Sequence, residues 1–163
     1  MIGAQKLLIL GGIALALLGM GYGLWYALFL EHQELGNIGE SLATGFSAAA
    51  ERHPAAADAA LKEYRESKYA YDRHVDVHGH WIGLAMLLIL LGIAFDRIAL
   101  SEPIKLLMAA GGVLGAFIFP FGVLLQGLSH GPAPRALAVA GSALVIAALA
   151  GMTLGFVREG RNS

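Results

Sequence analysis

Long stretches of apolar residues without a charged side chain dominate this chain. Three of them are long enough to cross roughly 30 Å of hydrocarbon, since a spanning α-helix needs about 20 residues. These runs cover residues 7–30, 106–125 and 136–157. The pattern therefore predicts three membrane-spanning helices.

A fourth apolar run, residues 81–95, is shorter than the others. At a rise of 1.5 Å per residue it covers only about 22 Å, so a span needs one or two further turns from a flank. Asp96 and Arg97 close the run at one end, which leaves residues 76–80 to complete it at the other. The predicted spans are residues 7–30, 77–96, 104–127 and 135–157, approximately.

The connection between the first two spans, residues 31–75, is also expected to be helical. Asn37 and Glu40 have the spacing of a capping box, which predicts that a short amphipathic helix begins there. Pro54 favours the first turn of a second helix, and no strong breaker follows it before the second span. The predicted fold is an all-α membrane protein, a four-transmembrane-helix bundle of up-down-up-down topology with a helical external connection.

Pairs of glycines four residues apart occur in three of the predicted spans. They are Gly19 and Gly23, Gly111 and Gly115, and Gly151 and Gly155. Because such pairs let membrane helices approach closely, the bundle is expected to be tight at these levels.

The composition agrees with a membrane protein, since 57% of the residues are apolar and 14% are charged, against about a quarter charged in soluble domains. The absence of cysteine excludes disulfides, thiolate metal sites, iron–sulfur clusters and covalently attached c-type haem. A net charge of −1 gives no footprint for nucleic acid. The expected partners are the lipid bilayer and other protein chains, either in a membrane complex or in a homo-oligomer.

Basic residues crowd the span ends on the side of the two termini: Lys6, Arg97, Lys105, Arg158 and Arg161. On the other side, only Arg135 lies directly beside a span. By the positive-inside rule, the termini are expected to be cytoplasmic and the long connection external, in a membrane of the bacterial inner-membrane type.

All six histidines fall at one end of the predicted bundle. His32, His53, His74, His78 and His80 lie between the first two spans, and His130 follows the third. Histidine is the commonest metal ligand and a usual axial ligand of haem iron. The sequence therefore predicts a cofactor site at this end.

Helical phase divides these residues into two sets. At 100° per residue, Asp72, Asp76 and His80 form one stripe, and His74 and His78 form another. One ion cannot use both stripes. For haem b, we expect ligation by His80 or His78.

The second axial ligand of such a haem must come from another helix. His32 is the favoured candidate, because it lies within a turn of the first span's end and its height is expected to match that of His80. His130, just after the third span, is the other candidate. His53 precedes Pro54 and is interpreted as a helix-start residue.

The stretch His78-Gly79-His80-Trp81-Ile82-Gly83 opens a leucine-rich span. It resembles the His-x-His, followed by small residues, of a haem-ligating helix in membrane proteins related to the haem-copper oxidase core subunit. The resemblance implies that His78 or His80 is an axial haem ligand in a relative or partner of a respiratory complex. The chain lacks the many-span body and deeply embedded histidines of an oxidase core, which argues against oxygen reduction by this chain alone.

Three functions remain open at this point, and no catalytic residues stand out. The first is a haem b-binding, cytochrome b-like electron-transfer subunit. The second is a non-haem site for copper, zinc or iron, built from His74, His78, Asp72 and Asp76. The third is a cofactor-free accessory or assembly subunit whose connection docks a larger complex.

Overall fold

The computed structural model describes residues 3–129 and 131–160, which are helical apart from short connections. The elements, in chain order, are α1 (Gly3–Phe29), α2 (Glu31–Ala50), α3 (Pro54–Ala94), the 3-10 helix η1 (Phe95–Arg97), α4 (Glu102–Leu128) and α5 (Pro132–Gly160). Four helical segments in this part of the chain are long and apolar enough to cross a membrane: Gly3–Phe29, Pro54–Arg97, Glu102–Leu128 and Pro132–Arg158. The predicted all-α fold with four spans is confirmed.

Helix α3 is the longest element and joins the external connection to the second span without a break. Pro54 occupies its first turn, where the missing N–H costs no hydrogen bond. The helix continues through Gly79 because a single glycine weakens a helix without ending it. This confirms the expectation of one continuous helix leading into the membrane.

Helix α2 corrects one predicted boundary. It begins at Glu31, directly after a break at Leu30, and not at Asn37. Two acidic residues in its first turn, Glu31 and Glu34, favour this start because they face the positive end of the helix dipole. The capping-box pattern at Asn37 lies inside the helix and caps nothing.

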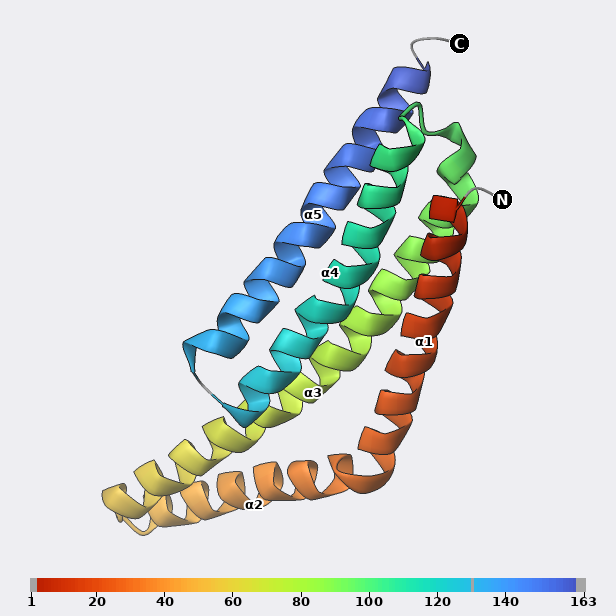
Figure 1. Ribbon diagram of the computed structural model, residues 1–163. Coiled ribbons are helices and arrows are strands. Elements are labelled where there is room, and N and C mark those ends of the chain that lie inside the picture. Colours follow the sequence, from red (N-terminus) through yellow and green to blue (C-terminus); the bar gives the residue numbers. More distant parts are fainter. Residues whose placement is uncertain (1–2, 130, 161–163) are drawn as a thin grey trace.

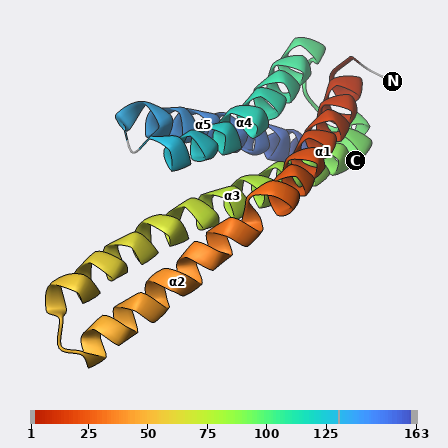
Figure 2. The same cartoon turned by 90° about the horizontal axis from the view of Figure 1, so that it is seen from below.

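The spans form a bundle from which a helical hairpin projects (Figure 1). Helix α1 packs against α3, α4 packs against both, and α5 packs chiefly on α4. After Leu30 the chain turns sharply away from α1, and α2 then runs beside the first half of α3 in both views (Figure 2). The name hairpin is used below for α2 together with the first half of α3.

Glycines bring the spans into close contact. A Cβ atom on Gly19 would lie 3.0 Å from the Trp81 Cβ, and one on Gly115 would lie 2.7 Å from the Gly141 carbonyl oxygen. These distances leave no room for a larger side chain. The predicted tight packing is therefore observed between α1 and α3 and between α4 and α5, whereas Gly111 has open space around it.

Candidate functional site

The polar segment of α3, residues 71–80, lies beside the last apolar turns of α1. Gly19 is level with Trp81, where the two helices nearly touch. Further along, the Tyr26 ring stacks on the His74 ring with centroids 4.8 Å apart. The polar segment is therefore level with the last turns of the apolar helix α1.

Helix α4 places the same segment at the same level from the other side. The His80 ring meets the Phe119 ring edge-on, with centroids 4.8 Å apart. A Cβ atom on Gly127 would lie 3.7 Å from the Arg73 Cβ. Ionisable side chains between Arg73 and His80 thus lie at the level of two apolar helix ends, which is where such residues are usually functional.

The histidines of α3 face two different neighbours. His74 and His78 contact α1, whereas His80 contacts α4. These contacts confirm the two stripes predicted from helical phase. The α4 side, formed by Arg73, Asp76 and His80 with Phe119 and Gly127, is called the α3–α4 seam below.

On the α1 side, four side chains from three helices form a polar network of two hydrogen bonds joined by one longer contact. The Tyr22 hydroxyl is hydrogen-bonded to His74 Nδ1, and the Tyr26 hydroxyl donates to Glu34 Oε2 at 2.6 Å. Glu34 Oε1 lies 3.6 Å from His74 Nε2. The His74 and Glu34 side chains are only 16% and 18% exposed. The network therefore ties α1, α2 and α3 together where the chain leaves the bundle.

The sequence did not predict the pairing of Glu34 with His74. Glu34 follows the break at Leu30, and its partner depends on the direction in which α2 leaves α1. No residue pattern specifies that direction. One feature of the sequence pointed to such a contact: Tyr22 and Tyr26, near the end of α1, carry hydroxyl groups that can form hydrogen bonds with a neighbouring helix.

His78 is held firmly in the contact between α1 and α3. Its Nδ1–H donates to the Gly19 carbonyl oxygen at 2.9 Å. A Cβ atom on Gly23 would lie 2.3 Å from the imidazole ring, so glycine is needed to admit the ring. His78 is thus a packing residue of this helix pair.

His80 has a different environment, because it is exposed on the α3–α4 seam. Its Nδ1–H donates to the Asp76 carbonyl oxygen one turn earlier at 2.6 Å. A carbonyl oxygen only accepts, so Nδ1 carries the proton and a neutral imidazole keeps its lone pair on Nε2. Gly79 and Gly83 have open space above them. His80 is therefore an exposed imidazole whose Nε2 is a potential ligand nitrogen.

The four residues of the predicted metal site have separate partners. Asp72 accepts from Lys68 Nζ at 2.5 Å, and Asp76 Oδ2 lies 2.8 Å from Arg73 Nη2. His74 and His78 turn toward α1 instead. Residues 3–129 and 131–160 contain no group of three or more His, Asp or Glu side chains placed to hold a metal ion.

The other histidines do not join His80 in the described structure. His32 is exposed in the first turn of α2, two residues from Glu34, which lies beside His74. Its expected match in height with His80 stays a prediction.

His53 is the N-cap residue of α3, and its ring lies 3.4 Å from the Glu51 carboxylate. Its interpretation as a helix-start residue is confirmed. His130 lies outside the described residues.

Comparisons of the chain with protein families, with curated proteins and with solved structures gave no match. The resemblance of residues 78–83 to a haem-ligating helix therefore stays a prediction.

Proposed function

We propose that the protein is an integral membrane, haem b-binding electron-transfer protein, or a subunit of a respiratory-type complex, with His80 as an axial haem ligand. The observation that carries this proposal is the hydrogen bond from His80 Nδ1 to the Asp76 carbonyl oxygen. Ligating histidines typically donate their other ring N–H to a carbonyl or carboxylate, which fixes the tautomer and the ring orientation. Haem bound at His80 would supply one-electron chemistry.

The surroundings of His80 fit a flat apolar macrocycle. Gly79 and Gly83, which neighbour His80 on α3, add no side chains to this surface. Phe119 supports the ring edge-on from α4. An open, apolar surface at the level of the spans is suited to bury a porphyrin ring away from water.

His78 is held by the Gly19 carbonyl and by the close contact with Gly23, so it is not proposed as a second ligand. We propose that a second ligand to the iron would come from His130, the residue after Ser129, or from a second chain.

The proposal is tested by measuring haem and metal on one purified preparation. A pyridine haemochrome assay and elemental analysis are applied to the wild type, to His80→Ala and to His53→Ala, whose ring is exposed and remote. We expect stoichiometric haem b in the wild type and in His53→Ala, and its loss from His80→Ala. A haem-free wild type that also fails to take up added haemin would overturn the proposal.

The same preparation tests the non-haem alternative. Copper, zinc or iron bound without haem, and lost from His74→Ala, would favour a metal site at His74, His78, Asp72 and Asp76. Their present partners argue against that arrangement, because both carboxylates are paired with cations of α3.

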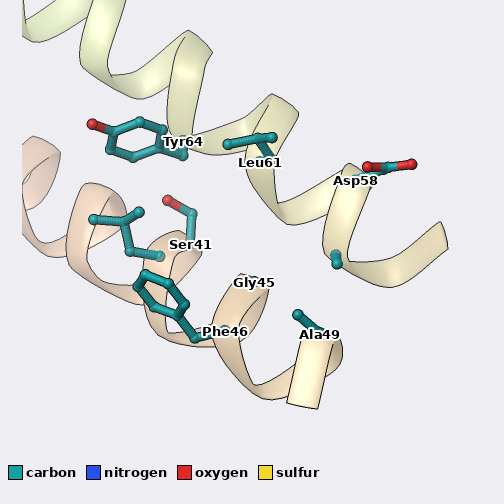
Figure 3. A pocket seen from close by; sticks show the side chains of 9 residues that line it. Ser41, Gly45, Phe46, Ala49, Asp58, Leu61 and Tyr64 are labelled. Atoms are coloured by element: carbon teal, nitrogen blue, oxygen red, sulfur yellow. The ribbon is translucent and has the colours of Figure 1, made fainter. Parts of the chain in front are cut away.

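A second candidate function is that of a cofactor-free accessory subunit, favoured by an open apolar groove in the hairpin (Figure 3). The groove has a volume of about 250 Å³ and lies between α2 and α3. Leu42 and Phe46 line it from one side and Leu61 and Tyr64 from the other. Phe46 is 73% exposed, and exposed apolar surface of this kind is typical of binding sites.

Photo-crosslinking in intact membranes tests this candidate. A crosslinking amino acid at position 46 should give a discrete product of higher mass, whereas one at Glu63, exposed outside the groove, should not. Equal products from both positions, or none from either, would contradict docking through the groove.

We also propose that the termini are cytoplasmic and the hairpin external, in a membrane of the bacterial inner-membrane type. The support is the crowding of basic residues at the span ends on the side of the termini.

A further inference from the structure

We propose that Arg73 binds a carboxylate of the group ligated by His80, namely a propionate of the haem. This inference rests on the proposed function and assigns a second contact to the same site.

Arg73 and His80 share one face of α3. They are seven residues apart, so their directions differ by only about 20° and they are separated by roughly 10.5 Å along the axis. Helix α4 confirms the alignment, since Arg73 lies opposite Gly127 and His80 lies opposite Phe119. Both residues therefore belong to the α3–α4 seam, two helical turns apart.

The guanidinium of Arg73 is held in place but is not fully paired. Arg73 Nη2 lies 2.8 Å from Asp76 Oδ2, and the guanidinium carbon lies 5.2 Å from the centre of the Tyr69 ring. Within the described part of the chain, Arg73 Nε is buried and has no hydrogen-bond partner. A guanidinium offers five N–H donors. The contact with the Asp76 carboxylate therefore leaves N–H donors of the guanidinium for a second anionic acceptor.

The position of Arg73 suits the polar edge of a porphyrin. Arg73 lies beside Gly127 in the last turn of α4, nearer the end of the spans than His80 does. A ring ligated by His80 would keep its apolar part deeper in the bundle, with the propionates toward the span ends. That orientation keeps the two negative charges out of the hydrocarbon, where charges are costly.

Arginine is the side chain best suited to this contact. Its charge is permanent, and its planar donors match the two oxygens of a carboxylate. Asp76 links the two parts of the site, because its side chain pairs with Arg73 while its carbonyl oxygen accepts from His80. A phosphate of a lipid headgroup presents similar anionic oxygens, so the test has to separate the two sources.

Haemin and haemin dimethyl ester provide that separation, because the ester removes both propionate charges and keeps the iron and the ring. The haem-free protein in detergent is titrated with each compound, and binding is followed by the Soret band. We expect the wild type to bind haemin about tenfold more tightly than the ester, or about 1.4 kcal/mol. In Arg73→Gln the ratio of the affinity for haemin to the affinity for the ester should fall close to one. Only the binding of haemin should weaken, and the binding of the ester should stay the same.

Matched variants keep the outcome clear. Arg65→Gln removes an exposed arginine of α3 outside the seam and should keep the tenfold ratio. Arg73→Lys keeps the charge and should keep part of the preference, which guards against misfolding of Arg73→Gln. An unchanged ratio in Arg73→Gln overturns the inference and favours a lipid phosphate as the partner of Arg73. Failure of the wild type to bind either compound through His80 overturns the proposed function itself.

Discussion

Glu34 of α2 and His74 of α3 lie 3.6 Å apart at the point where the hairpin leaves the bundle. Their contact is reinforced from α1, because Tyr26 donates to Glu34 and Tyr22 is hydrogen-bonded to His74. Both side chains are largely buried, so water screens their contact only weakly. This pair therefore fixes how the hairpin is set against the spans.

Loss of this contact should loosen the hairpin. In a double-mutant cycle, Glu34→Ala and His74→Ala should show a coupling energy of about 1 kcal/mol or more, because removing either partner leaves the other poorly paired. The free energies of unfolding are measured in detergent by denaturant titration. The exposed pair of Lys62 and Glu66, 3.9 Å apart, is the control and should couple by less than about 0.5 kcal/mol. Equal coupling in the two pairs would contradict a structural role for Glu34 and His74.

A side chain at Gly23 should displace His78. The Cβ of Gly23→Ala would lie 2.3 Å from the imidazole, so the ring or the helix must move, at a cost of about 1–3 kcal/mol. Thermal unfolding in detergent should show a lower Tm for this variant. Gly21→Ala, where the added Cβ meets nothing within 4 Å, should leave the Tm unchanged or slightly raised. Matching decreases at both positions would point to helix propensity or lipid contacts in place of the His78 contact.

The proposed orientation can be measured by labelling single cysteines, because the chain has no cysteine of its own. Ser47 in α2 and Ser101 at the start of α4 are both exposed and can be replaced by cysteine. Helix α2 and the first turn of α4 lie toward opposite ends of the molecule (Figure 1). A maleimide that cannot cross the membrane should label position 47 in intact cells. Position 101 should react only after permeabilisation. The reverse pattern would place the hairpin in the cytoplasm.

The sequence predicted most of the fold because long apolar runs and Pro54 act locally. Spans follow from the lengths of the runs, and the continuity of α3 follows from the lack of a breaker after Pro54. Helical phase also predicted correctly that His80 and His74 face different neighbours. These features depend on residues that are close together in the chain.

The parts that were missed depend on contacts between distant segments. The start of α2 at Glu31 and the pairing of Glu34 with His74 both follow from the sharp turn at Leu30, which brings α2 against α3. Trp81 packs against Gly19, well before the end of α1, and this register is set by close glycine packing across the two helices.

Ligation of haem by His80 is tested most directly by rescue of a glycine variant with free imidazole. Reduced-minus-oxidised absorption spectra are recorded for the wild type and for His80→Gly, with and without imidazole, after reconstitution with haemin. We predict Soret and α bands in the wild type, their loss in His80→Gly, and their return when imidazole replaces the missing side chain. A wild type without these bands, or a His80→Gly variant that keeps the full spectrum without imidazole, would contradict ligation by His80.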